Sequence, residues 1–169
     1  MSVFVLAEAA RGVRPDDWGF PLFLHVLGAL VMVGALVTAA YFLFAARRDG
    51  TLESLRAGYK TLLYGAIPSF IVMRVGAEWI SDKEGWRDLD SPPDFIDIGY
   101  MTSDPGVLLI IISTVLAGLA VRRAGRTDAQ AEGGAATAGT GVAIAGWLTA
   151  FMVLAFTVAV WAMTTKAGV

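Results

Sequence analysis

The sequence contains no cysteine and only one histidine, His25. The absence of cysteine excludes disulfide bonds, thiolate zinc sites, iron–sulfur ligation and thiol catalysis, and it leaves the redox compartment open. Charge is also missing from long runs, since no Asp, Glu, Lys or Arg occurs between Trp18 and Ala46. Of the 169 residues 56% are hydrophobic, and the net charge is −2. This composition offers no cationic excess for nucleic acid, and it favours a lipid bilayer as the solvent.

Four segments are predicted to cross the membrane as helices. An α-helix needs about 20 mainly apolar residues to span the hydrocarbon core. The segments that meet this condition cover residues 18–46, 59–80, 104–121 and 141–164. In Ser103-Asp104-Pro105 a capping residue precedes a proline suited to the first helical turn, which predicts the start of the third span. The predicted fold class is an all-α membrane protein, an antiparallel four-transmembrane-helix bundle.

The remaining segments are predicted to lie outside the hydrocarbon core. Residues 1–17 read as an exposed N-terminal tail, because the apolar stretch before Arg11 is too short for a cleaved signal peptide. Residues 122–140 are rich in Ala, Gly and Thr and lack apolar periodicity, which predicts a flexible inner linker within the membrane domain, residues 18–169. Pro68 is predicted to kink the second span.

The distribution of charge predicts the orientation. Seven basic residues fall in or beside the two segments that link spans one to two and three to four: Arg47, Arg48, Arg56, Lys60, Arg122, Arg123 and Arg126. The segment between spans two and three is mainly acidic and contains only Lys83 and Arg87 as basic residues. By the positive-inside rule the two basic segments face the cytoplasm. We therefore predict a multi-pass protein of the cytoplasmic membrane with both termini outside.

Three ionisable residues within the spans form the predicted site. His25, Arg74 and Glu78 share a depth in the outer half of the bundle, and Glu78 follows Arg74 by four residues, so that the two can pair on one helix face. His25 shares its helix face with mostly small residues, Gly28, Ala29, Met32, Leu36 and Ala39, and this predicts that it faces another helix. The three residues are candidate cofactor-binding residues, with His25 as the candidate metal ligand. No catalytic residue is assigned.

Two interpretations of these residues remain open at the level of sequence. Arg74 and Glu78 can line a polar cavity, or they can reach the headgroups from their positions near a helix end. His25 can be a packing histidine hydrogen-bonded across the bundle, or it can ligate haem b or a metal ion. A haem would lack a second histidine, so its other ligand would be a methionine (Met73, Met152 or Met163) or a group from a second copy.

The first half of the chain resembles a bacterial family of small predicted integral membrane proteins. The likeness begins in residues 22–50, with the pattern Leu24-His25-x-x-Gly28-Ala29, and continues through Leu55-Arg56, Pro68 and Gly76. A looser similarity extends to the copper-resistance membrane domain and to the membrane-bound protoporphyrinogen oxidases, which also place one histidine early in the first helix. The resemblance implies metal or tetrapyrrole handling at His25.

Three classes of function follow from these features. The first is a haem- or metal-binding redox or accessory protein that uses His25. The second is a non-catalytic subunit or interaction protein of a membrane complex, and the third is a small oligomeric transporter or channel with an outer cavity lined by Arg74 and Glu78. The expected partners are the lipid bilayer, other membrane subunits or further copies of the chain, and not nucleic acid. The residues do not decide whether the protein is an enzyme.

Overall fold

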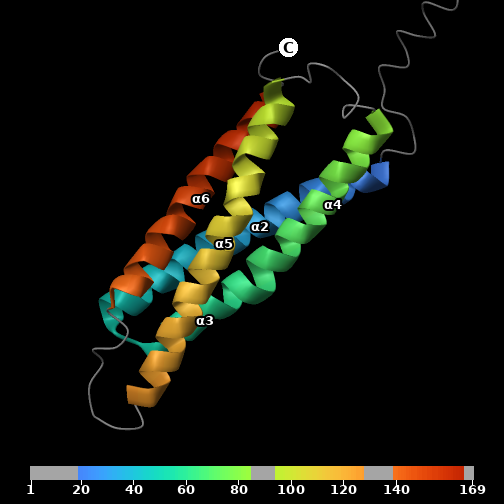
Figure 1. Cartoon of the computed structure of the whole chain (residues 1–169). Coiled ribbons are helices and arrows are strands. Elements are labelled where there is room, and N and C mark those ends of the chain that lie inside the picture. Colours follow the sequence, from blue (N-terminus) through green and yellow to red (C-terminus); the bar gives the residue numbers. More distant parts are fainter. Residues whose placement is uncertain (1–18, 85–93, 128–138, 166–169) are drawn as a thin grey trace, which may run out of the picture.

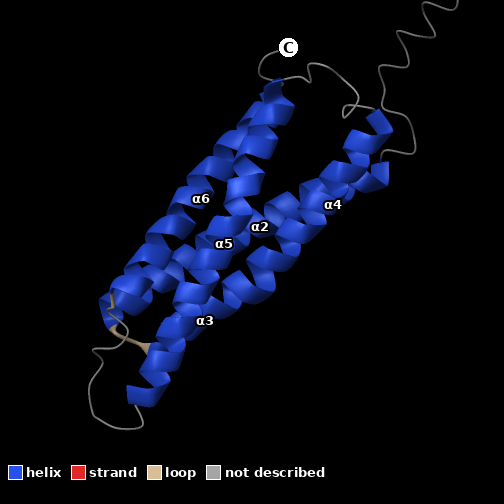
Figure 2. Cartoon of the chain, viewed as in Figure 1, coloured by secondary structure: helices blue, strands red, loops and turns tan. Residues whose placement is uncertain are grey.

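The computed structural model describes residues 19–84, 94–127 and 139–165. These residues are almost entirely helical, and the described ranges contain no β-strand (Figure 2). In chain order the elements are α2 (Gly19–Asp49), α3 (Leu52–Thr61), the π-helical turn η2 (Leu62–Ala66), α4 (Ile67–Glu84), α5 (Asp94–Thr127) and α6 (Thr140–Thr165). The predicted all-α class is therefore confirmed.

Among the described residues, three helices are long and apolar enough to cross a membrane by their length and composition. They are α2, α5 over Asp94–Arg126, and α6. The segment predicted as the second span, residues 59–80, is helical throughout, but its apolar part is divided among α3, η2 and α4. Within α4, the charges of Arg74, Glu78 and Lys83 lower the hydropathy.

Helix α2 lies side by side with the continuous helical segment formed by α3, η2 and α4, and the chain runs along this segment in the direction opposite to α2 (Figure 1). Glycines mark the line of contact. Gly58 of α3 faces Leu43, Gly65 of η2 faces Ala35, and farther along the pair Gly28 of α2 faces the backbone of Met73. Small residues allow helix axes to approach closely, and at Gly28 the backbones of α2 and α4 come into contact.

Helices α5 and α6 form a second closely packed pair. Gly99 of α5 faces Met163, and Gly106 faces Phe156, so these two helices also run in opposite directions. Helix α2 packs along α6, and α3 packs along α5. Toward the C-terminal end of α4 the two pairs diverge, as Figure 1 shows, and α4 touches α5 much less than it touches α2.

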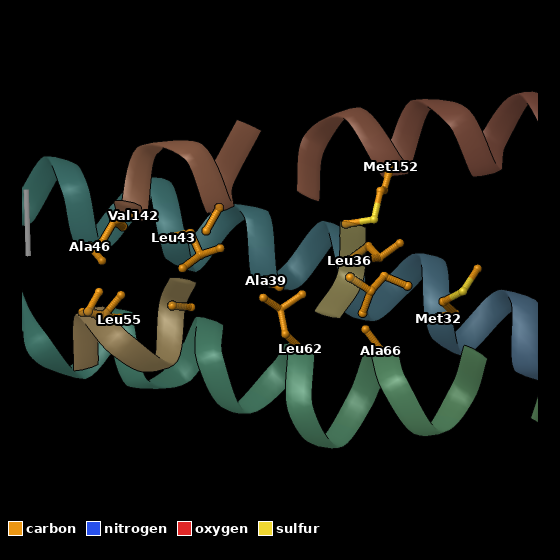
Figure 3. Close-up of a cluster of buried hydrophobic side chains, with 14 of the residues drawn as sticks. Met32, Leu36, Ala39, Leu43, Ala46, Leu55, Leu62, Ala66, Val142 and Met152 are labelled. Atoms are coloured by element: carbon orange, nitrogen blue, oxygen red, sulfur yellow. The ribbon is translucent and has the colours of Figure 1, made fainter. Parts of the chain in front are cut away.

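The buried side chains lie between the two pairs. Met32, Leu36 and Leu43 of α2 meet Leu62 of η2 and Met152 of α6 (Figure 3). On α5 one row of buried positions recurs at alternating intervals of three and four residues, with Thr114 buried beside it: Ile96, Gly99, Ser103, Gly106, Ile110, Ser113, Ala117, Ala120 and Ala124. This spacing is typical of helices packed at a shallow angle.

The helix start predicted at Ser103-Asp104-Pro105 is wrong. Helix α5 begins at Asp94, and Pro105 lies inside it. Proline lacks an N–H and leaves the carbonyl four residues earlier without its usual donor. Pro105 and Met101 both lie on the exposed face of α5, where the carbonyl of Met101 can accept from another donor. The row of buried α5 residues, which we call the buried stripe, continues past them on the opposite face. Packing of the stripe therefore outweighs the local signal for a helix start.

The boundaries differ at two further places. Helix α5 continues to Thr127, so residues 122–127 are helical and do not belong to a flexible linker; residues 1–17, and residues 128–138 of the predicted linker, lie outside the described residues. The π-helical turn Leu62–Ala66 lies directly before Pro68. A π-turn widens the helix and accommodates the proline ring and its missing hydrogen bond, and the kink predicted at Pro68 stays a prediction.

Candidate functional site

His25 lies where α2 crosses α4. Its Nδ1 atom is 3.0 Å from the carbonyl oxygen of Met73, and the side chain is half-buried. A carbonyl oxygen only accepts hydrogen bonds, so Nδ1 must carry the proton and donate. In the neutral ring Nε2 then holds a lone pair and is the remaining coordinating atom. The hydrogen bond thus fixes both the tautomer and the orientation of the imidazole.

The crossing around His25 is tight. A Cβ atom added to Gly28 would overlap the backbone of Met73, and one added to Gly76 would lie 2.6 Å from the backbone nitrogen of His25. Each helix therefore places a glycine three residues after the residue that forms the hydrogen bond. The backbones are in contact, and a porphyrin ring has no room between α2 and α4 at this level. Any large group bound to His25 must lie on the side of the imidazole away from Met73.

The methionines considered as second ligands take other positions. Met73 meets His25 through its carbonyl oxygen. Met152 is buried beside Leu36, as Figure 3 shows, and Leu36 lies eleven residues after His25, about 16 Å along α2. Met163 packs against Gly99 of α5. Among the described residues there is also no group of three or more His, Asp or Glu side chains placed to hold a metal ion. His25 offers a single ligand.

A second polar group joins α4 to α5. Arg74 Nε lies 2.9 Å from Glu78 Oε1, and its Nη1 lies 2.9 Å from Asp104 Oδ1. Nη1 also donates to Ser103 Oγ at 2.6 Å. The guanidinium is 4.6 Å from the centre of the Tyr100 ring, whose hydroxyl donates to Glu78 at 3.3 Å. We call these five residues the Arg74 network.

The Arg74 network confirms the predicted pairing of Arg74 with Glu78 and adds residues that the sequence does not predict. The pair of Arg74 and Glu78 was expected from their spacing and is formed. Asp104, Ser103 and Tyr100 were not expected there, because Ser103 and Asp104 were assigned to a helix start. The periodic stripe of α5, which places Ser103 on the buried face, is the signal that could have found them.

His25 is outside the Arg74 network. Met73, its partner, faces α2, whereas the next residue, Arg74, extends toward α5. In the described part of the chain, the hydrogen bond of the imidazole goes to Met73 and not to Arg74 or Glu78. The structure therefore joins two of the three predicted site residues and leaves the third on a different helix interface.

The Arg74 network lies well inside the length of the apolar helices. Met73 faces Gly28, which is nine residues into α2, or about 14 Å from its first residue. The side chains of Arg74 and Glu78 are 28% and 30% exposed, and that of Asp104 is 63% exposed. Arg74 is thus directed to two carboxylates rather than to the helix end alone. Pairing lowers the cost of a charge among apolar side chains.

Comparison with family models, with curated proteins and with solved structures finds no match for this chain. The interpretation of the two sites therefore rests on their geometry.

Proposed function

We propose that the chain spans the cytoplasmic membrane four times as an antiparallel bundle. Helices α2, α5 and α6 are three of the spans. For the fourth, α3, η2 and α4 follow one another without interruption from Leu52 to Glu84 and lie along α2. The ion pairs of Arg74 with Glu78 and Asp104 support this placement, because paired charges cost much less in a membrane than isolated ones.

The proposed orientation places both termini outside. The exposed basic residues at the ends of α2 and α5 and in α3 lie at one end of the helices, and the acidic residues Asp82, Asp94 and Asp97 lie at the other. Cytoplasmic segments are enriched in Lys and Arg, so the basic end is assigned to the cytoplasm.

Within this architecture we infer that His25 binds a haem or another metal-containing group through Nε2. The observation that carries the inference is the hydrogen bond from Nδ1 to the carbonyl of Met73. Histidines that ligate metals usually donate their other ring N–H to a carbonyl or carboxylate, which orients the ring and raises its basicity. The remaining lone pair would be costly to leave without a partner in hydrocarbon.

His25 would supply one ligand to such a group, and the side of the imidazole that faces Met73 is closed. The contact between the backbones of α2 and α4 keeps a macrocycle out of their interface, so the group would lie against the outward side of the imidazole. A second ligand would then come from a partner subunit or from another copy of the chain. When bound, a haem would supply one-electron redox chemistry, and this chain would contribute the ligand, its orientation and an apolar surrounding.

A membrane subunit without a cofactor is the second candidate. The same Nε2 lone pair could accept a hydrogen bond from a donor on a neighbouring membrane helix. The third class, a transporter lined by Arg74 and Glu78, receives less support, because those two charges are bound to each other and to Asp104.

The absorption spectrum of the purified protein separates the two candidates. The wild type and two variants, His25→Ala and Thr38→Ala, are purified from membranes of cells supplied with haem precursors. Thr38→Ala is the control, because Thr38 is an exposed residue on the same helix as His25. The haem proposal predicts a Soret band in the wild type and in Thr38→Ala, and no band in His25→Ala. A bound metal ion would appear in elemental analysis with the same dependence on His25. A colourless, metal-free wild type would contradict the haem or metal proposal and favour the second candidate, a membrane subunit without a cofactor.

A further inference from the structure

A cavity of about 270 Å³ opens between the last part of α5 and the start of α6. Its wall includes Leu116, Leu119, Ala120 and Arg123 from α5, and Thr140 and Gly141 from α6. Small-molecule sites in proteins usually measure about 300–1,000 Å³, so this cavity is suited to part of a ligand rather than to a large one.

The wall of the cavity is divided into an apolar and a polar part. Leu116, Leu119 and Ala120 come first along α5, nearer the middle of the helices, and Arg123 follows one turn later, nearer the end. Thr140, at the first turn of α6, adds a hydroxyl at the level of that end. A molecule that fits this division has an apolar part along the helices and a polar part at their end.

The charge of this end indicates the sign of the polar part. Seven exposed cations gather at the C-terminal ends of α2 and α5 and along α3: Arg47, Arg48, Arg56, Lys60, Arg122, Arg123 and Arg126. The acidic side chains in the same stretches of α2 and α3 are Asp49 and Glu53. An anionic group is therefore favoured, and arginine binds phosphate oxygens through two parallel hydrogen bonds.

We propose that this cavity binds the headgroup of an anionic phospholipid. Arg123 contacts the phosphate, and the first part of an acyl chain lies against Leu116 and Leu119. Basic pockets between membrane helices commonly recognise anionic headgroups in this way. The proposal rests on the membrane embedding proposed above, since the end of a spanning helix lies at headgroup level. It does not depend on His25.

The test follows the thermal unfolding of the full chain in detergent as lipid is added. Phosphatidylglycerol should raise the midpoint, whereas phosphatidylcholine with the same acyl chains and inorganic phosphate should not. With Arg123→Gln, about five times more phosphatidylglycerol should be needed for the same rise in the midpoint. This is the change in affinity expected for the loss of one interfacial cation. Arg122→Gln makes the same charge change at the same helix end, but Arg122 does not line the cavity, so its response should be retained.

A variant without a change in charge keeps the test independent of general electrostatics. Gly141 lines the cavity, and a Cβ atom there would meet no atom within 4 Å, so a leucine at this position begins in open space at the cavity wall and is expected to extend into the cavity. This variant should lose the response to phosphatidylglycerol. The proposal is overturned if Gly141→Leu responds like the wild type, if Arg122→Gln and Arg123→Gln lose equal amounts, or if phosphatidylcholine stabilises equally well. An equal effect of inorganic phosphate would also overturn it, by assigning the site to a soluble anion.

Discussion

The Arg74 guanidinium lies 2.9 Å from the carboxylate of Asp104 and so connects α4 to α5. These two helices otherwise touch much less than α2 touches α4 or α5 touches α6. At the middle of α4, before the two helix pairs diverge, a polar contact therefore joins them in a molecule whose described core is otherwise packed mainly by apolar side chains. This makes Arg74 a sensitive point of the fold.

Arg74→Gln should destabilise the protein more than Asp104→Asn. The first change leaves Glu78 and Asp104 without their cation, whereas the second leaves an amide oxygen that still accepts from Arg74. For groups that are partly exposed we expect a loss of about 1–2 kcal/mol for Arg74→Gln. Thermal unfolding of both variants and of the double variant measures the coupling. Equal losses for the two single variants would contradict the expected order, and strictly additive effects would contradict a coupling between the two charges.

Two glycines of α2 should respond in opposite ways to the same substitution. A Cβ atom at Gly28 would overlap the backbone of Met73, so Gly28→Ala must separate α2 from α4 and should cost about 1–3 kcal/mol. Gly34 is exposed and a Cβ atom there would meet nothing within 4 Å, so Gly34→Ala should be neutral or stabilising by up to about 1 kcal/mol. Their unfolding midpoints, compared in one detergent, check both. Equal effects would contradict the close crossing.

Much of the fold could be predicted because charge-free apolar runs report helices directly. The expected ranges 18–46 and 141–164 differ by a few residues from α2, Gly19–Asp49, and α6, Thr140–Thr165. The start of α5 could not be predicted from Ser103-Asp104-Pro105, because that local signal competes with a buried stripe whose importance depends on the packing of α6.

The candidate site was predictable only where it is local. The pair of Arg74 with Glu78 follows from a spacing within one helix, and it is formed. The contact of Arg74 with Asp104 joins residues thirty positions apart and depends on how α4 and α5 are aligned. The partner of His25 is a backbone carbonyl, and no side-chain pattern reports a backbone atom. Sequence periodicity therefore indicated that His25 faces a helix, but not what it binds there.

Ser113 should tolerate, and benefit from, loss of its hydroxyl. Its side chain is fully buried, and in the described part of the chain its Oγ atom has no hydrogen-bond partner. An unsatisfied buried hydroxyl costs about 1–3 kcal/mol, so Ser113→Ala should raise the midpoint of thermal unfolding. Thr149→Val is the control, because the Thr149 hydroxyl donates to the carbonyl of Ala145 at 2.7 Å. A lower midpoint for Ser113→Ala would indicate that the hydroxyl has a partner, such as a bound water.

The most direct test of the proposed architecture is whether residues 52–84 cross the membrane, because the fourth span and the depth of Arg74 depend on it. The chain has no cysteine, so single cysteines introduced at Glu53 and Asp82, both exposed, can be labelled without background. A membrane-impermeant maleimide applied to intact cells should modify Asp82→Cys, and it should modify Glu53→Cys only after the membrane is permeabilised. The reverse pattern would overturn the orientation but keep the span. Labelling of both positions from the same side would contradict the four-span architecture.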